Sequence, residues 1–249
     1  MSDHHSISCS RRTVLGGASA LVLGAAFWPA TLLAQTNAGD KSRIGVIGSG
    51  KIGGTIGELW VKAGHPVLFS SRHPEELKDL AARLGPLAQT GTVAQAIDFG
   101  GVIFVAVPYG ALPQIGKDNA TALKNKIVLD ACNAVASRDG AITEEVEQNG
   151  IGVTSQKYLA GTRLVRAFNT MSYMTFAREA NRPAPRLAIP IAGDDAEAVR
   201  VAAALISDAG FDPVVVGKLA DARRFQRGNQ GYGQPVSANE LRQKLNLKQ

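Results

Sequence analysis

The chain alternates between short apolar runs and longer segments with helical periodicity. The strongest runs are residues 44–47, 102–107 and 127–131, and none shows the alternating polar positions of a half-exposed strand. Continuous apolar strands of this kind are buried on both faces, which is typical of a parallel sheet covered by helices. The pattern predicts an α/β protein with a Rossmann-type, doubly wound parallel sheet and a small C-terminal α/β extension.

The individual elements follow from the same pattern. We expect strands at 43–47, 67–69, 86–90, 102–107, 127–131, 164–168, 187–191 and 211–216. We expect helices at 51–63, from 74 onwards, and at 92–99, 111–123, 154–159, 171–179, 194–209 and 238–245, with Asp194 capping the penultimate one. Residues 132–153 are interpreted as a loop with helical character at 143–148. Pro190 indicates an edge strand, because proline cannot donate to a sheet ladder. We place the domain boundaries at 41–162 and 163–249, the second part completing the sheet and the substrate pocket.

Residues 1–34 have the pattern of an export signal rather than of a folded element. Arg11 and Arg12 form a twin-arginine pair, an apolar segment of small residues follows, and residues 32–34 resemble the end of a cleavable signal. The apolar run of about 14 residues is shorter than the ~20 needed to cross a bilayer. This resemblance to a Tat signal implies a periplasmic or otherwise exported protein, the Tat translocase as a partner, cleavage after Ala34 and no stable membrane span afterwards. A Sec signal and an uncleaved anchor are the alternatives.

Charge and cysteine content exclude several classes of protein. The formal net charge of +6 is mild for 249 residues, and the basic residues are scattered, so nucleic acid is not an expected partner. Cys9 falls in the expected signal and Cys132 is the other cysteine, so the mature chain cannot form an intrachain disulfide. The sequence shows no metal-ligand spacing, and we expect no metal site.

The glycine-rich stretch after the first strand is the most informative motif. Gly48, Gly50 and Gly53 have the spacing GxGxxG between an apolar strand and an amphipathic helix. Gly48 permits the tight turn, Gly50 leaves room for a pyrophosphate, and Gly53 lets the helix pack close to the strand. The helix N-terminus adds free N–H donors for phosphates. A dinucleotide is therefore the expected ligand of residues 41–162, and a purely structural glycine turn is the alternative.

The end of the second strand indicates which dinucleotide is bound. A carboxylate there would bind the ribose 2′-hydroxyl of NAD, whereas an arginine accepts a 2′-phosphate. The chain has Ser71 and Arg72 at this point, and the first carboxylate is Glu75. Hydroxyl and guanidinium donors suit a phosphate, so we expect NADP. A solvated loop arginine is the alternative.

Three further strand ends supply candidate residues at the same edge of the sheet. Val107, Pro108 and Tyr109 follow one strand, Asn133 follows the next, and Asn169 the one after. Ligands of open α/β sheets lie beyond the carboxyl ends of the strands, so these residues are placed to contact the ribose and nicotinamide or a substrate. For Tyr109 the alternative is a side chain that only covers the sheet edge.

A catalytic residue cannot be named from the sequence. The sequence contains no Ser/His/Asp set and no paired carboxylates. Hydride transfer does not require such groups, because the cofactor supplies the chemistry. If a ketone were the acceptor, Tyr109, Tyr173 and His73 would be the uncharged proton donors nearest the rim. Cys132 is interpreted as a buried inert thiol, with a nucleophile as the alternative.

Several segments together resemble the NADP oxidoreductase, coenzyme F-420-dependent family, whose domain also occurs in six-transmembrane metalloreductases. The segments are RIGVIGSGKIGGTIGELWVKAGHPV, FSSR, VAVPYGAL, residues 130–133, LVRAFNT, PIAGDDAEA and AGFDPVVVGKLADAR, within residues 43–224. The resemblance implies hydride transfer between NADP and a deazaflavin, and it implies cofactor contacts at Gly48, Ser49, Lys51, Ile52, Ser71, Arg72, Val107 and Asn169. The export signal and the segment 225–233 depart from the family pattern.

The sequence thus favours an exported NADP-dependent oxidoreductase that passes hydride between NADP(H) and a deazaflavin (F-420), a flavin or another small acceptor. A non-catalytic NADP-binding sensor or interaction module is the alternative. A small-molecule acceptor is the expected partner, and a homodimer is left open.

Overall fold

The computed structural model describes residues 41–247, so the expected export signal and its cleavage site lie outside the described residues. The described residues 41–247 belong to one compact unit, which includes both of the parts that we separate at residue 162, and that boundary stays a prediction. Among residues 41–247, no helix combines the length and the apolar character needed to cross a membrane.

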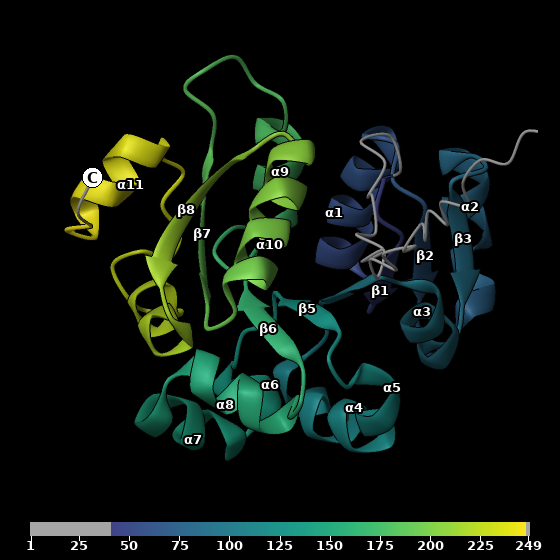
Figure 1. Cartoon of the computed structure of the whole chain (residues 1–249), viewed down its shortest axis with the longest axis horizontal. Helices are drawn as coiled ribbons and strands as arrows, with labels where there is room; N and C mark the ends of the chain where they lie inside the picture. The colour runs from purple at the N-terminus through teal and green to yellow at the C-terminus, as the bar shows by residue number, and fades with distance from the viewer. Residues whose placement is uncertain (1–40, 248–249) are drawn as a thin grey trace, which may run out of the picture. The chain divides into compact units, whose positions relative to one another are not determined.

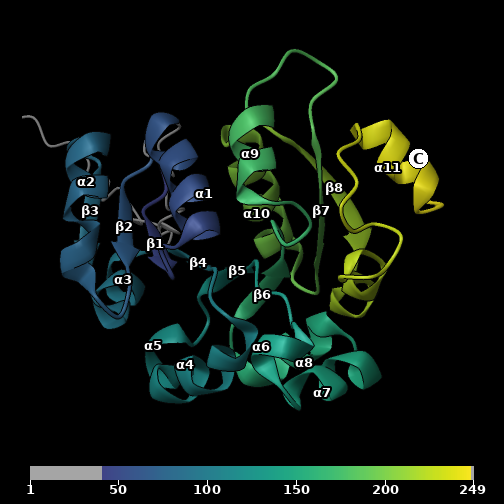
Figure 2. The same cartoon turned by 180° about the vertical axis from the view of Figure 1, so that it is seen from behind.

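An eight-stranded sheet organises residues 41–247 (Figures 1 and 2). The strand order is β3-β2-β1-β4-β5-β6-β7-β8, with parallel pairing throughout except between β6 and β7. The strands are β1 Ile44–Ile47, β2 Val67–Ser70, β3 Ala88–Gly91, β4 Val102–Val105, β5 Ile127–Asp130, β6 Arg163–Arg166, β7 Ala188–Gly193 and β8 Asp212–Gly217. The order reverses between β1 and β4, as in doubly wound folds. The predicted α/β fold with a mostly parallel sheet is confirmed.

Helices connect the strands and pack on the sheet. The α-helices are α1 Lys51–Lys62, α2 Lys78–Leu84, α3 Val93–Phe99, α4 Leu112–Asp118, α5 Ala120–Leu123, α6 Ala136–Asp139, α7 Ile142–Asn149, α8 Ile151–Tyr158, α9 Tyr173–Glu179, α10 Ala196–Asp208 and α11 Ala238–Lys244. Three 3₁₀ helices are described as well, at Pro74–Leu77, Tyr109–Ala111 and Leu219–Phe225.

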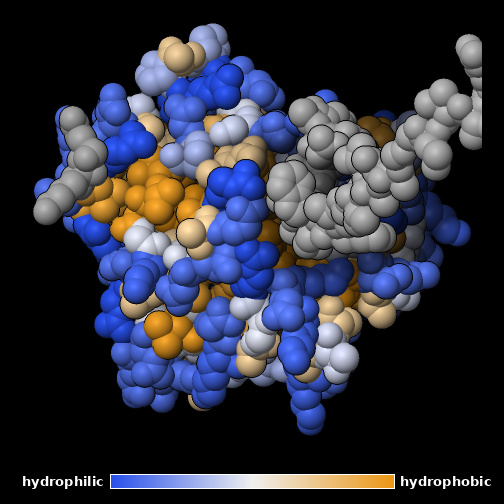
Figure 3. Space-filling model, in the orientation of Figure 1, coloured by the Kyte–Doolittle hydropathy of each residue, from blue (hydrophilic) through white to orange (hydrophobic). Residues whose placement is uncertain are grey.

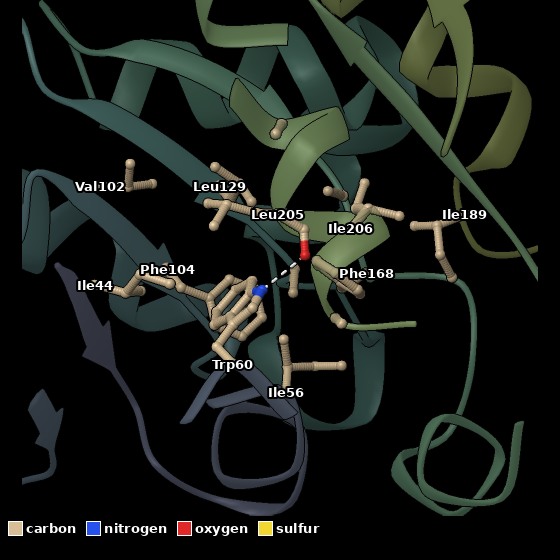
Figure 4. Packing of buried hydrophobic residues seen from close by; sticks show 14 of the residues in the cluster. Ile44, Ile56, Trp60, Val102, Phe104, Leu129, Phe168, Ile189, Leu205 and Ile206 are labelled. Atoms are coloured by element: carbon tan, nitrogen blue, oxygen red, sulfur yellow. Dashed lines mark hydrogen bonds between the residues drawn. The ribbon is translucent and has the colours of Figure 1, made fainter. Parts of the chain in front are cut away.

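An aromatic cluster joins α1, α9 and α10 to one face of the sheet. Trp60 of α1 packs edge-to-face against Phe104 and Phe168, with ring centroids 5.0 and 5.7 Å away. Its Nε1 donates to the carbonyl oxygen of Leu205 in α10 at 2.8 Å (Figure 4). Phe176 of α9 packs against Phe168 at 5.7 Å. A buried indole needs a partner for its N–H, and this bond supplies it.

A second buried cluster contains residues from β5 and from the helices around it. Tyr109, Leu112, Val128, Ile151 and Leu219 are among its members, and each is at most 3 % exposed. Buried side chains on both faces explain why the strands read as continuous apolar runs.

An apolar surface patch lies at the β8 end of the sheet. Hydrophilic residues cover most of the face in Figure 3, and apolar residues gather where β7 and β8 lie in Figure 1. Val215 of β8 is 54 % exposed. Since β8 is the last strand in the order, this patch lies far along the sheet from β1 and β2.

Residues 132–153 contain three helices, so the predicted loop is wrong in part. Helical character at 143–148 is confirmed as part of α7, and the helix expected at 154–159 begins earlier, at Ile151. Gly140 and Gly150 follow α6 and α7 with φ of +63° and +84°, which glycine adopts most easily. Each helix is therefore too short to show a clear periodicity in the sequence.

Strand β7 is an interior strand, contrary to the edge position predicted from Pro190. It lies between β6 and β8, but its pairing with β6 ends at Ala192. The N–H of Ala188 donates to the oxygen of Val236 at 2.9 Å. Backbone N–H groups two residues apart in a strand point to the same side, so the nitrogen of Pro190 points to the same side as the N–H of Ala188, away from β8. Pro190 also lies outside the part of β7 that pairs with β6, which comprises Ala192 and Gly193. Proline is tolerated there because no ladder bond is lost.

The cap of α10 is Asp195 rather than the predicted Asp194. The Asp195 carboxylate accepts the N–H of Ala198 at 2.8 Å and also binds Arg163 through both oxygens. Asp194 instead accepts the N–H of Leu219 at 3.1 Å. The sequence does not distinguish these two neighbouring aspartates as helix caps. Their contacts with Arg163 and Leu219 determine which one caps α10.

Candidate functional site

The glycine turn between β1 and α1 has the geometry that its spacing predicts. Gly48 has a φ of +92°, and a Cβ there would lie 2.6 Å from the oxygen of Ala106. A Cβ on Gly53 would lie 2.0 Å from the oxygen of Gly48. A Cβ on Gly50 would meet no atom within 4 Å. Glycine is thus required at two positions for packing, and the third borders open space.

The start of α1 presents unpaired donors and a cation. The N–H groups of Lys51, Ile52 and Gly53 belong to the first turn, where no acceptor exists within the helix. The Lys51 ammonium lies 5.2 Å from the ring centroid of Tyr173, at the start of α9. The helix dipole adds positive potential at this end. Together these groups form an environment that favours an anion.

Ser70 at the end of β2 fixes the turn to the sheet. Its carbonyl oxygen accepts the N–H groups of Gly48 and Ser49 at 3.2 and 3.0 Å, and the Ser49 hydroxyl at 3.1 Å. Its own hydroxyl is buried and donates to the oxygen of Val46 at 2.7 Å. Ser49 therefore positions the loop in this structure.

Ser71 and Arg72 lie just beyond β2, beside the end of β1. The Ser71 hydroxyl accepts the N–H of His73 at 2.8 Å, which holds this loop in a tight turn. Arg72 is exposed and forms no ion pair with any residue between 41 and 247. Its guanidinium is therefore accessible to a phosphate group.

A pocket of about 250 Å³ lies beyond the carboxyl ends of β4 and β5, at the start of α1. Residues from the ends of these two strands and from α1 and α6 line it: Lys51, Ile52, Ala106, Val107, Pro108, Ala131, Cys132, Asn133 and Arg138. The strand order reverses beside it, between β1 and β4. This is where open α/β sheets bind their ligands. The structure thus brings the predicted Lys51, Ile52, Val107, Pro108 and Asn133 together.

Cys132 forms part of the pocket wall but its thiol is inert. The sulfur accepts the N–H of Val107 at 3.4 Å and donates to the oxygen of Val105 at 3.6 Å. Burial raises the pKa of the Cys132 thiol well above its ordinary value, with the nearby Asp130 charge as a smaller cause. A protonated, 2 % exposed thiol is a poor nucleophile, as the sequence interpretation expects.

Asn133 and Asn169 meet at the ends of β5 and β6. The Asn133 amide donates to the carbonyl oxygen of Asn169 at 2.6 Å. The Asn169 amide donates to the oxygen of Phe225 at 3.2 Å, while its own side-chain oxygen is buried without a partner. Phe168, just before it, has a φ of +57°, an uncommon conformation for a bulky residue. The chain is thus held in a costly conformation next to the pocket, as often occurs at functional sites.

Tyr109 does not line the pocket, in contrast to its predicted role as a cofactor contact. Its side chain is fully buried, and its hydroxyl lies 3.1 Å from the Ser155 hydroxyl in α8. Burial raises the pKa of Tyr109, and the Asp130 charge adds to this. The residue therefore stabilises the packing of α8, and it is also unsuited as a proton donor at the rim.

A buried ion pair that was not predicted from the sequence holds the backbone of Cys132 in the pocket wall. Arg166 of β6 and Asp130 of β5 are fully buried, with Nη1 and Oδ2 2.5 Å apart. Arg166 also donates to the oxygen of Cys132 at 2.7 Å, and Asp130 accepts the Cys132 N–H at 2.8 Å. A charged residue inside the apolar run LVRAF is the signal that could have revealed the pair.

Arg138 lines the pocket and was not predicted from the sequence. It lies in α6, within the segment interpreted as a loop, and its Nη2 donates to the oxygen of Asn133 at 2.7 Å. Asp139 beside it is 2 % exposed and accepts the N–H groups of Gly110 and Val135 at 3.1 and 2.8 Å. The contact between Gly110 and Asp139 spans 29 residues of sequence, so local pattern could not indicate it.

The residues present fit a phosphorylated dinucleotide. The turn at Gly48 and Gly53 excludes side chains, Gly50 borders open space, and the first turn of α1 offers N–H donors. Arg72 at the end of β2 is free, and the pocket at β4 and β5 continues along the same edge of the sheet. The ligand would contact strand ends in the order in which the sheet arranges them.

Comparison with curated proteins finds a relative that is a metalloreductase. Over 197 residues, the chain is 29% identical to the metalloreductase STEAP3 of Rattus norvegicus, covering 75% of this chain and 36% of that protein. The chain therefore spans about a third of the length of this relative.

Solved structures share the fold. A hypothetical protein from Sinorhizobium meliloti superposes with a TM-score of 0.69 at 25% identity, covering 79% of this chain and 95% of that one. A putative F420-dependent NADP-reductase from an Arthrobacter species superposes with a TM-score of 0.61 at 22% identity, covering 73% and 87%. Residues 43–134, which include the glycine turn, Ser71, Arg72 and Asn133, match the family described as NADP oxidoreductase, coenzyme F420-dependent. This segment of the chain is thus similar to the domain that defines an NADP oxidoreductase family.

Proposed function

We propose that this chain is an exported NADP-dependent oxidoreductase that transfers a hydride between NADP(H) and a flavin, a deazaflavin or another small acceptor. The glycine turn with its open Gly50 position, next to the accessible Arg72, is the observation that carries the proposal. The family match over residues 43–134 supports it, because the motif lies inside that segment.

Each part of the site has a defined task in this proposal. The first turn of α1 and Lys51 hold the pyrophosphate, and Ser71 and Arg72 hold the 2′-phosphate. Val107, Pro108 and Asn133 form the wall against which the nicotinamide is oriented. NADP(H), when bound, supplies or accepts the hydride. The protein's contribution is to align the two reactants and to exclude water.

The proposed export has a functional consequence for the cofactor. Tat substrates cross the membrane already folded, so NADP made in the cytoplasm would leave with the protein. The twin-arginine segment at Arg11 and Arg12 supports this route, with the Tat translocase as the transient partner.

The test is NADPH oxidation by the purified chain with added FMN, a deazaflavin or a ferric chelate. We expect saturable NADPH oxidation, with one NADPH consumed per flavin or deazaflavin reduced, or per two ferric ions reduced. Tight NADPH binding without turnover on any of these acceptors would contradict the enzyme and favour a non-catalytic NADP-binding sensor or interaction module.

A further inference from the structure

The pocket at the ends of β4 and β5 is one-sided in charge. Of the side chains that line it, Lys51 and Arg138 are cationic, and no lining residue in the described part of the chain is acidic. Cationic side chains attract a phosphate or carboxylate group but not an uncharged acceptor. The pocket lining therefore favours acceptors that carry a negative charge.

The ion pair between Arg138 and Asp139 does not cancel this charge at the pocket. The Asp139 side chain is 2 % exposed, and its two oxygens accept bonds from the backbone and from the Nε and Nη2 atoms of Arg138. The Arg138 side chain is 46 % exposed, and its Nη1 forms no hydrogen bond with residues 41–247. The carboxylate is hidden behind the guanidinium, so the group presented to a ligand is positive.

The 2′-phosphate of NADP does not account for Arg138. The expected 2′-phosphate site follows β2, whereas Arg138 lies after β5. The pyrophosphate has Lys51 and the N–H groups of the first turn of α1 as its expected partners, far in sequence from α6. Two strands, β1 and β4, separate β5 from β2 in the sheet. Adjacent strands lie ~4.8 Å apart, which places Arg138 well away from Arg72. The cation remains for the second substrate.

We propose that Arg138, held in place by Asp139 and the carbonyl group of Asn133, selects acceptors that carry a phosphate or carboxylate group beside the ring that receives the hydride. The proposal rests on the oxidoreductase function above and adds the substrate class. The two N–H groups of Nη1, which form no hydrogen bond within residues 41–247, can donate to an oxygen of either anion, and the positive charge strengthens such a bond.

FMN and riboflavin are the probes that isolate this role, because they share one ring system and differ in the 5′-phosphate. The reaction NADPH + H⁺ + FMN → NADP⁺ + FMNH₂ balances, with the hydride passing to the flavin and the proton coming from solvent. We expect the chain with NADP⁺ added to bind FMN at least about tenfold more tightly than riboflavin, as one charge-assisted contact provides. Equilibrium dialysis measures both affinities without turnover.

The variant Arg138→Gln is expected to lose that preference while keeping its riboflavin affinity, and Arg138→Lys to keep part of it. Arg200→Gln is the matched control, since Arg200 is also an exposed, ion-paired arginine but lies on α10. Equal affinity for both flavins in the native chain would overturn the proposal, and so would an equal loss of both in Arg138→Gln. Failure of NADPH oxidation with every acceptor contradicts the proposed function instead, and equal turnover of FMN and riboflavin contradicts the role of Arg138 alone.

Discussion

At the residue scale, the contact between Gly53 and Gly48 sets how closely α1 approaches the turn that begins it. A Cβ at position 53 would lie 2.0 Å from a backbone oxygen, which no side-chain adjustment can relieve. The backbone must shift, and the N–H groups of the first turn shift with it. The packing of α1, and the position of the N–H groups proposed to bind the cofactor, therefore depend on the absence of a Cβ at position 53.

We predict that Gly53→Ala lowers the stability by about 1–3 kcal/mol, as overpacking does, and weakens NADPH binding at least about tenfold. Thermal unfolding and calorimetric titration measure the two effects. Gly54→Ala is the control, because its Cβ would meet the Ser49 oxygen at an ordinary 3.5 Å. A helical Gly54→Ala is expected to be neutral or stabilising. Similar losses in both variants would show that the close approach at Gly53 has no special role.

The glycines of the turn could be predicted from the sequence, whereas the side-chain positions of Tyr109 and Arg138 could not. Gly48, Gly50 and Gly53 act through local geometry, so spacing alone indicates them. The side chains of Tyr109 and Arg138 depend on Ser155 and Asp139, which distant segments position. Sequence placed Tyr109 at the right strand end, but the direction of its side chain is a tertiary property.

At the element scale, the Asp130–Arg166 pair joins β5 to β6 directly below the pocket. The two residues are partners in the parallel register, and both are fully buried. Breaking such a pair leaves an uncompensated buried charge, whereas replacing both members removes the charge altogether.

We predict that Arg166→Leu destabilises the chain by about 3–5 kcal/mol and that adding Asp130→Leu restores part of the loss. Urea unfolding measures both variants. Arg163→Gln on the same strand is the control, because its ion pair with Asp195 is partly exposed and is expected to contribute at most about 1 kcal/mol. A double variant no more stable than Arg166→Leu alone would rule out charge burial as the cause.

Element prediction from the sequence succeeded where strands are buried on both faces and failed where helices are short. The parallel strands are continuous apolar runs, which few other structures produce. Helices α6 and α7 end at glycines after four and eight residues, so periodicity has too few turns to appear. The position of β7 was mispredicted because Pro190 reports only local pairing and not the strand order.

At the scale of the whole molecule, one sheet combines the glycine turn of β1 with the pocket of β4 and β5. The strand order places these ends side by side, so residues that are 90 positions apart in the chain, Gly48 and Arg138, border the same sheet edge. The likeness to the Sinorhizobium meliloti structure covers 79% of this chain, and the family match ends at residue 134. The wall formed by Arg138 lies just past that match.

The proposed export also concerns the whole chain. We predict that replacing Arg11 and Arg12 together by lysine sharply reduces the amount of protein in the periplasmic fraction of a Gram-negative host, because the proposed Tat signal depends on this arginine pair. Arg200→Lys serves as the control. Undiminished export of the double variant would contradict the Tat assignment.

The central claim is that this chain binds NADP through its 2′-phosphate at Arg72. The most direct measurement is the affinity for NADPH and NADH, by calorimetric titration, of the native chain and of Arg72→Ala. We predict that the native chain prefers NADPH and that the variant loses about tenfold or more in NADPH affinity with little change for NADH, since only NADPH carries the charged group. Equal losses for both nucleotides, or no native preference, would contradict the claim.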